Sequence, residues 1–266
     1  MKELSAEIGI IGGTGVSYHE LFSSTERRKI HTPYGSTSDD LVIGEHKGKS
    51  IAFISRHGRS HTIPPHLVNN RANIWALKSL GVSRILAPSA VGSLKDNIQP
   101  GDIVISNQFI DFTKKREYTF YDGRQVCHIS SADPFCSELI QVANSAANNT
   151  GCRAHVNSTY LCIEGPRFST RAESKYFREN LSADVIGMTV VPECVLAREM
   201  EICYVSIATV TDYDVWSRDP VSSEKIIMVV KENIKKISKL LSKMIPEIPK
   251  LRNTCICPTA LDGAFV

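Results

Sequence analysis

The chain lacks several features that would assign it to other protein classes. No apolar run approaches the roughly 20 residues that span a bilayer, and the first seven residues lack the apolar core of a signal peptide. The 31 basic and 28 acidic residues are spread along the chain, so no basic tract favours a nucleic acid or a membrane surface. Eight cysteines among 266 residues are too few for a secreted disulfide scaffold. These absences predict a cytoplasmic protein that binds neither nucleic acid nor membrane.

The sequence also lacks internal repeats, low-complexity segments and linkers, so we expect a single domain over residues 1–266 with a tail over 246–266. Short apolar runs alternate with helical patterns, which predicts an α/β fold with a central mixed, twisted β-sheet flanked by helices. The expected strands cover residues 8–11, 41–43, 51–54, 85–87, 103–105, 160–163, 185–186 and 204–210. The expected helices cover residues 67–80, 137–147, 171–179 and 195–201, with a long one from about 221.

The first strand breaks into Gly12-Gly13-Thr14-Gly15. Such a turn presents backbone N–H groups and one hydroxyl, which suit an anion. Its spacing is not the dinucleotide fingerprint, and no acidic residue closes a second strand to hold a ribose. A dinucleotide-binding oxidoreductase is therefore a weaker alternative, and a purely structural tight turn is another.

Arg56 and His57 follow the strand at 51–54, at the carboxyl end where α/β sheets usually bind ligands. Arginine offers phosphate a planar fork of donors, and the neighbouring imidazole would add one more. His61 and His66 are close in sequence, but no glutamate completes a zinc-protease pattern and two prolines interrupt any helix. We favour an anion site over a metal site.

Two more polar segments follow strands on the same edge. The segment 87–93 places Ser89 in a loop near a glycine, and Asp212-Tyr213-Asp214 closes the strand at 204–210. Alone, each is more typical of an ordinary loop or a solvated acidic pair. Because these segments meet the other two at one edge of the sheet, we expect a shared ligand site.

Seven motifs occur together and in order: Gly-Gly-Thr-Gly at 12–15, Arg-His-Gly at 56–58, Ile-Gln-Pro-Gly-Asp-Ile-Val at 98–104, Phe-Tyr-Asp-Gly at 120–123, Glu-Gly-Pro-Arg-Phe-Ser at 164–169, Arg-Ala-Glu-Ser at 171–174 and Thr-Asp-Tyr-Asp at 211–214. This set resembles the trimeric purine nucleoside phosphorylase family, in its methylthioadenosine phosphorylase branch, from about residue 8 to 245. The resemblance implies the nucleoside phosphorylase fold. It also implies phosphorolysis of 5'-deoxy-5'-methylthioadenosine to adenine and 5-methylthioribose 1-phosphate, a pentosyl transfer in purine and methionine salvage.

The resemblance also implies which residues form the site. The phosphate ligands would be Gly13, Thr14, Arg56, His57, Ser89, Ala90 and Thr189. The nucleoside would meet Phe168 over the purine, Met188 against the ribose, and Ser169, Asp212, Tyr213, Asp214 and Val221, with His128 of a neighbouring subunit near the methylthio group. The expected partners are a nucleoside, inorganic phosphate as co-substrate and copies of the chain in a homotrimer or homohexamer. No metal or organic cofactor is expected.

Base selection is expected to rest on Asp212 and Asp214, because Gly187 stands where some relatives place an asparagine. A carboxylate accepts from a 6-amino group, and a carboxylic acid can donate to N7. Burial would raise the pKa of Asp212, so that it protonates the departing adenine. A 6-oxopurine or general purine nucleoside phosphorylase is the alternative within the class, and a non-catalytic nucleoside-binding module would need a broken phosphate site.

Cys255-Ile256-Cys257 stands in a polar tail, where two thiols alone make a poor zinc site and close only a strained ring. Two idle thiols are the simple alternative. The thermophilic archaeal enzymes that the chain resembles carry disulfides, and Cys136, Cys194 and Cys203 stand where such a fold could gather them. The resemblance therefore implies a thermophile protein with Cys136 bonded to Cys203 and at least one tail cysteine oxidised.

Overall fold

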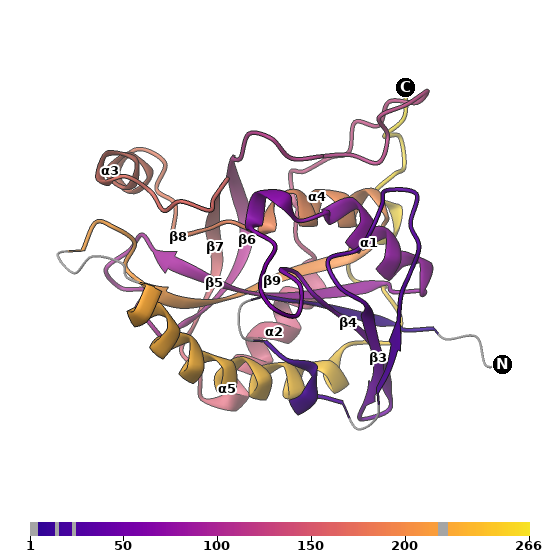
Figure 1. The fold of residues 1–266 in the computed structure, drawn as a ribbon, viewed down its shortest axis with the longest axis horizontal. Helices are drawn as coiled ribbons and strands as arrows, with labels where there is room; N and C mark the ends of the chain where they lie inside the picture. The colour runs from indigo at the N-terminus through magenta and orange to yellow at the C-terminus, as the bar shows by residue number, and fades with distance from the viewer. Residues whose placement is uncertain (1–4, 14–15, 23–24, 218–222) are drawn as a thin grey trace.

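One mixed β-sheet organises the chain, in a computed structural model that describes residues 5–13, 16–22, 25–217 and 223–266 (Figure 1). In the described residues the strand order is β2-β3-β4-β1-β5-β8-β7-β6-β9. The strands are β1 (Ile8–Gly12), β2 (Thr25–Arg28), β3 (Leu41–His46), β4 (Lys49–Ser55), β5 (Arg84–Ser93), β6 (Ile103–Phe112), β7 (Ala154–Ile163), β8 (Val185–Gly187) and β9 (Cys203–Asp212).

The sheet closes on itself at one end. Strand β9 pairs parallel with β5 and antiparallel with β6, so the strands β5, β8, β7, β6 and β9 form a ring. Strand β9 has partners on both sides and helices packed against it, and Cys203–Val210 is buried throughout. Its β-branched residues Val205, Ile207 and Val210 suit that position. The parallel strands β1, β4, β5 and β9 bring their carboxyl ends to the same edge.

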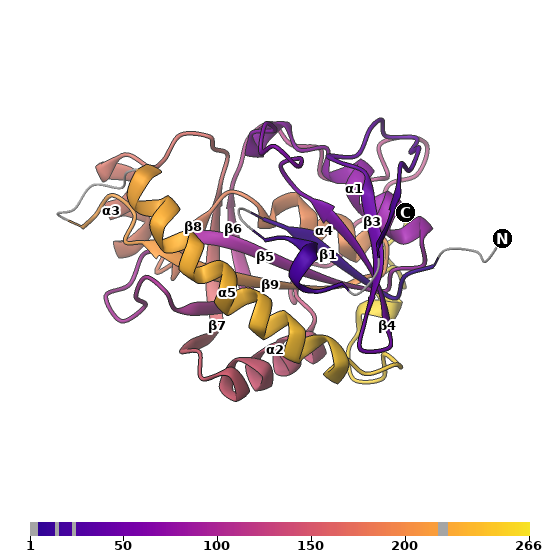
Figure 2. The ribbon, with the colours of Figure 1, turned by 60° about the horizontal axis from the view of Figure 1, so that its bottom comes forward.

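Helices cover both faces of the sheet: α1 (Asn70–Ser79) and α4 (Val190–Glu199) lie on one face, and α2 (Ser137–Thr150) and α5 (Ser223–Glu247) on the other (Figures 1 and 2). Helix α3 (Arg171–Glu179) lies at the end of the sheet, where it begins with a capping box between Thr170 and Glu173. Short 3-10 turns are η1 (Tyr18–Glu20), η2 (Pro65–Leu67) and η3 (Cys257–Thr259).

The α/β fold and the mixed sheet flanked by helices are confirmed, and every expected strand and helix is present. Two details differ. Strand β2 was not expected, because its residues are all exposed and carry no apolar alternation. The segment 87–93 is not a loop but the second half of β5, because β9 pairs with β5 along its whole length.

Within the described part of the chain, none of the helices has both the length and the apolar character to span a membrane. The tail after α5 folds back over the body, although its sequence shows no helical or strand pattern. The last residues of the tail reach the segment before α2. Cys127 and Phe265 form an antiparallel β-bridge, and the His128 amide donates to the Ala264 carbonyl at 2.8 Å.

Candidate active site

A cavity of about 560 Å³ opens at the carboxyl edge of the parallel strands. Its volume lies in the range of small-molecule sites. The expected site residues that line it are Gly13, Arg56, His57, Ser89, Ala90, Phe168, Ser169, Met188, Thr189, Asp212 and Asp214. Gly13, Arg56, Ser89 and Asp212, one from each of the four segments that the sequence predicted to converge, thus meet at one place.

Four expected residues are not placed in this cavity. Tyr213 does not line it and stacks edge-on against Trp216, with ring centroids 5.3 Å apart. His128 lies against the C-terminal residues and does not line the cavity of its own chain. Thr14 and Val221 lie outside the described residues.

Arg56 lies at one end of the cavity, where its guanidinium is already held by the protein. Its Nε–H donates to Glu193 Oε1, one Nη2–H donates to Glu193 Oε2 at 3.0 Å, and one Nη1–H donates to the Pro88 carbonyl at 3.0 Å. Arginine has five N–H donors, so two remain for a ligand. The expectation of a free fork is therefore wrong: Glu193 takes the bidentate face, and both side chains are 1% exposed.

The Arg56–Glu193 pair sets the charge at this end of the cavity. Burial would lower the pKa of Arg56, but the adjacent Glu193 carboxylate raises that pKa above its usual value. Arg56 therefore stays charged, with the Glu193 carboxyl group against its guanidinium. Tyr204 donates its hydroxyl proton to Glu193 Oε2 at 2.9 Å and completes the buried network.

His57 has a single possible tautomer in this structure. Its Nδ1 lies 2.9 Å from the Ile63 carbonyl oxygen, which can only accept, so Nδ1 carries the proton. Burial and the neighbouring Arg56 charge lower the pKa of His57 to about 4, so the imidazole is neutral at pH 7. Nε2 is then an acceptor, and the sequence-based expectation of one more donor to phosphate is wrong. A neutral His57 can accept from the O–H of a protonated phosphate.

Ser89 and Gly13 complete this end of the cavity. Ser89 Oγ is buried and has no hydrogen-bond partner among the described residues. A Cβ on Gly13 would lie 2.7 Å from the Pro88 carbonyl and 2.9 Å from Arg56 Nη1, so only glycine lets the chain pass this close. An unpaired hydroxyl beside the two remaining arginine N–H groups suits an oxyanion.

Asp212 and Asp214 form the acidic end of the cavity. Asp212 accepts from the Asp214 amide at 2.8 Å and from the Thr211 hydroxyl at 2.7 Å, which fixes its carboxyl group. Burial raises the pKa of Asp212, and it raises that of Asp214 with the help of the Asp212 charge. A Cβ on Gly92 would lie 2.9 Å from Asp212 Oδ1, so that glycine leaves room for the carboxylate. The pair can accept or donate at the edge of a bound base.

Tyr160 explains the glycine at position 187. A Cβ there would lie 1.9 Å from the Tyr160 hydroxyl oxygen. Tyr160 is fully buried in β7, and its hydroxyl reaches Thr189 Oγ1 at 3.3 Å. The tyrosine thus fills the space that a longer side chain at Gly187 would need. The sequence showed the glycine but not its neighbour, because the two lie on different strands.

Arg116 is a residue of the site region that sequence reasoning missed. Its side chain is 3% exposed, and it donates to Glu164 Oε1 at 3.0 Å, to the Glu164 carbonyl at 2.7 Å and to the Met188 carbonyl at 2.9 Å. Burial would raise the pKa of Glu164, but Arg116 and the amides of 114 and 115 lower it. Arg116 therefore holds two cavity walls together, the segment after β7 and Met188. An arginine between Lys115 and Glu117 carries no sequence signal for this role.

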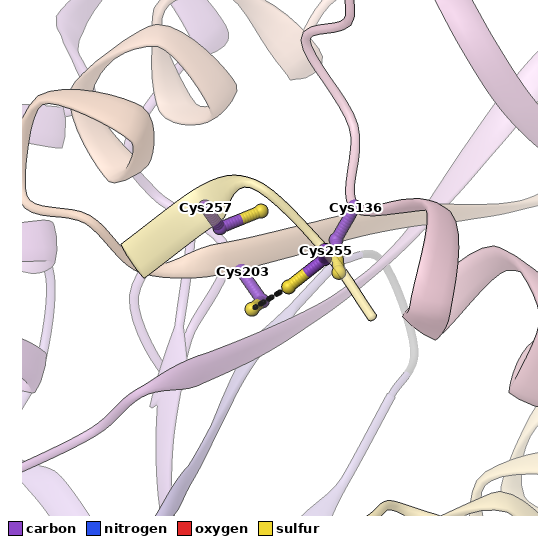
Figure 3. Close-up of side chains that lie close together, drawn as sticks. All are labelled: Cys136, Cys203, Cys255 and Cys257. Carbon is purple, nitrogen blue, oxygen red and sulfur yellow. Dashed lines mark hydrogen bonds between the residues drawn. The ribbon is translucent and has the colours of Figure 1, made fainter. Parts of the chain in front are cut away.

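The cysteines do not form the predicted bond: all eight are free thiols in the structure. Cys136 and Cys203 do lie together, but Cys255 and Cys257 join them, so that each sulfur has several sulfur neighbours (Figure 3). Cys194 is buried in α4 and is not part of this group. Cys257 is only 5% exposed, although it stands in the polar tail.

Comparison with known proteins gives consistent matches over nearly the whole chain. The model of the phosphorylase superfamily matches residues 7–246. An S-methyl-5'-thioadenosine phosphorylase from Pyrococcus abyssi is 58% identical over 260 residues, 98% of this chain and 99% of the relative, and one from Saccharolobus solfataricus is 51% identical over 263 residues, 98% and 97%.

Solved structures also match over most of the chain. A methylthioadenosine phosphorylase from an antarctic soil metagenomic library superposes with a TM-score of 0.94 at 42% identity, over 99% of this chain and 93% of the other. A methylthioadenosine phosphorylase from Schistosoma mansoni in complex with adenine gives a TM-score of 0.88 at 37% identity, over 92% of both chains.

Proposed function

Because the chain belongs to the phosphorylase superfamily, we propose that its cavity is the site of phosphorolysis of 5'-deoxy-5'-methylthioadenosine. The protein is a pentosyltransferase that releases adenine and forms 5-methylthioribose 1-phosphate, a step of purine and methionine salvage. The observation that carries the proposal is the joining of an anion-binding end and an acidic end in one cavity.

Phosphate is assigned to the end that contains Gly13, Arg56, His57, Ser89, Ala90 and Thr189. The two remaining N–H groups of Arg56 and the unpaired Ser89 hydroxyl donate to its oxygens, and His57 Nε2 accepts from its O–H. This set orients phosphate by hydrogen bonds more than by charge, because Glu193 neutralises Arg56.

Adenine is assigned to Asp212 and Asp214, with Phe168 over the ring and Met188 against the ribose. As the bond from the anomeric carbon to N9 breaks, positive charge develops on the sugar and is stabilised by the bound phosphate. A phosphate oxygen then bonds to that carbon. Asp212, whose pKa burial raises, donates a proton to N7 of the leaving adenine. The residues present suffice for this step, and a reaction without metal or organic cofactor remains the prediction.

The apolar wall of the cavity suits a methylthio group. Ile63, Pro64 and Ile163 line the cavity and offer no partner to a 5'-hydroxyl. Discrimination by apolar contacts is limited to about 1–3 kcal/mol per group, so adenosine should be a slower substrate.

The experiment that tests this proposal measures adenine release from 5'-deoxy-5'-methylthioadenosine with and without phosphate. Release should require phosphate and yield one equivalent of the sugar phosphate. Equal release in phosphate-free buffer would identify a hydrolase.

Ser89→Ala is the sharper probe of the phosphate end. Loss of one hydrogen bond to a charged ligand costs about 1.5–3 kcal/mol, so KM for phosphate should rise about 10- to 100-fold. Arg56→Ala would instead leave Glu193 buried without its partner and confound binding with folding. Ser79→Ala, at the end of α1, is the matched control. An equal rise in KM for the nucleoside would mean that Ser89 is structural.

A further inference from the structure

Four cysteine side chains from three separate segments converge beside the start of β9 (Figure 3). Cys136 immediately precedes α2, Cys203 begins β9, and Cys255 and Cys257 belong to the tail. Their four sulfur atoms all lie within 4.8 Å of one another, and the Cys203 and Cys255 sulfurs are 3.5 Å apart. No other set of three or more potential ligands converges in this way among the described residues.

These separations match a tetrahedral metal site. A zinc–sulfur bond of about 2.3 Å places the corners of a tetrahedron about 3.8 Å apart. The Cys203 and Cys255 sulfurs, 3.5 Å apart, are close to that edge length, and no pair in the cluster is more than 4.8 Å apart, so side-chain movements alone would bring the four sulfurs around one ion. Cys136, Cys203 and Cys257 are almost fully buried, and Cys255 is partly buried. Such a closed, sulfur-only set selects a thiophilic ion over magnesium or calcium.

We propose that Cys136, Cys203, Cys255 and Cys257 bind one zinc ion in a closed structural site. The tail pair alone makes a poor site, but the fold supplies the two missing thiolates. Disulfides would have to pair these sulfurs two by two, and the tail pair would close a small, strained ring. One ion would bind all four sulfurs without such a ring.

Polar contacts around the cluster hold the tail in place for this role. Arg84 donates to the Leu251 carbonyl at 2.9 Å, and the Thr254 hydroxyl donates to Glu138 Oε2 at 2.7 Å. Glu138 in turn forms an ion pair with Arg84 at 3.3 Å. The tail therefore reaches the cluster along a buried ion pair and presents its two cysteines to the two in the body.

The site would have a structural consequence at the far end of the tail. Beyond Cys257, the chain continues to Phe265, which pairs with Cys127 and contacts the Tyr121 ring at a centroid distance of 5.1 Å. The segment around His128 is thus held by a tail that the zinc ion would anchor. Loss of the ion should loosen both.

The test uses the full-length untagged protein, grown with added zinc and purified without chelators. Elemental analysis should find one zinc per chain, and thiol titration of the denatured protein should find eight thiols. Substitution by cobalt should give the intense visible absorption of a tetrahedral thiolate site. Removal of the metal should lower the melting temperature.

Variants and alternative outcomes make the proposal falsifiable. Cys255→Ser and Cys257→Ser should each lose the metal, whereas the matched control Cys152→Ser, outside the cluster, should keep it. Where a variant fails to fold, a thiol-blocking mercurial is added to the wild-type protein instead. It should release one zinc ion per chain. Four fewer thiols without metal would mean two disulfides. Eight thiols without metal after exposure to zinc would mean idle cysteines, and iron in place of zinc would overturn the choice of ion. Each of these results would overturn the proposal and leave phosphorolysis unaffected.

Discussion

At the phosphate end of the cavity, His57 is buried as a neutral imidazole, and this makes folding sensitive to acid. The pKa of His57 is about 4 in the folded chain and 6.5 when unperturbed, so the unfolded chain takes up the proton first. The contribution of neutral His57 to the free energy of unfolding is therefore fully present above pH 6.5. It is lost as the pH falls towards 4, by at most about 3 kcal/mol.

Urea denaturation between pH 7 and pH 4 checks this prediction. His57→Gln should flatten the slope of unfolding free energy against pH in that window, because it removes the group that titrates. His31→Gln, at an exposed position, is the control. An unchanged slope in His57→Gln would assign the acid sensitivity to other groups.

Asp212 gives the opposite dependence of stability on pH. Burial raises the pKa of Asp212 in the folded chain, so its ionisation opposes folding as the pH rises through that value. Asp212→Asn should therefore raise the melting temperature at neutral pH, and the gain should vanish in acid, where the wild-type carboxyl is protonated. The same variant should lower kcat for the methylthio nucleoside by about 10²- to 10⁴-fold, because the proton donor is lost.

A 6-oxopurine nucleoside provides the selectivity readout for Asp212→Asn. An amide can donate to a 6-oxo group and a carboxylate cannot, so the variant should gain some turnover of inosine relative to the aminopurine nucleoside. Asp96→Asn, whose wild-type side chain is 82% exposed, is the control. Unchanged selectivity would remove Asp212 from base recognition.

The sequence and the family resemblance predicted eleven of the residues that line the cavity, but not the partners that define their chemistry. Arg56 and His57 were found because they follow a strand. Glu193, which occupies the bidentate face of Arg56, comes from α4, 137 residues away. The tautomer of His57 depends on the Ile63 carbonyl, a backbone atom that no residue type signals. Hydrogen-bond partners of this kind follow from the fold and not from local pattern.

Among the elements, the short strand β8 is under the tightest packing constraint. Any side chain at Gly187 meets the Tyr160 ring of β7. Gly187→Ala should therefore destabilise the protein by about 1–3 kcal/mol through overpacking. Tyr160→Leu alone should also destabilise it, by leaving a cavity.

Combining the two changes tests the contact directly. In the double variant Gly187→Ala with Tyr160→Leu, the new methyl group fills part of the space that the ring leaves, so the loss should be smaller than the sum of the single losses. The free energy of unfolding in urea is measured for the wild type, the two single variants and the double variant. Strict additivity would show that the two positions do not interact.

Elements with an apolar period were predictable, and those defined by pairing alone were not. The helix at Arg171–Glu179 was predicted from its helical pattern with the correct ends, and the structure adds a capping box at its start. Strand β2 is exposed throughout and depends on β3 for its hydrogen bonds. The second half of β5 contains Pro88 and Gly92, which signal a loop, yet β9 holds it as a strand.

At the scale of the whole molecule, His128 is held away from the cavity of its own chain by the C-terminal residues. A role for His128 at the methylthio group therefore requires a neighbouring subunit. We expect sedimentation equilibrium to give the mass of three, or six, chains of 29.4 kDa. His128→Ala should raise KM for the methylthio nucleoside and leave KM for phosphate unchanged.

The exposed His31→Ala is the control for this change. A fully active monomer would contradict both the assembly and the role of His128. The trimeric expectation comes from the family resemblance, because composition and periodicity carry no information about symmetry. The folded-back tail was equally beyond the sequence, since residues 249–266 have no apolar period and are placed by contacts with distant segments.

The buried Arg56–Glu193 pair also bears on how phosphate arrives. With the arginine charge cancelled and His57 neutral, these residues project no long-range field that would draw a dianion out of solution. Ionic strength screens only such fields, so capture of phosphate should be almost insensitive to added salt. Recognition at short range depends on the tetrahedral shape and the proton of the anion, and arsenate, which shares both, should enter the same end of the cavity and drive adenine release to completion.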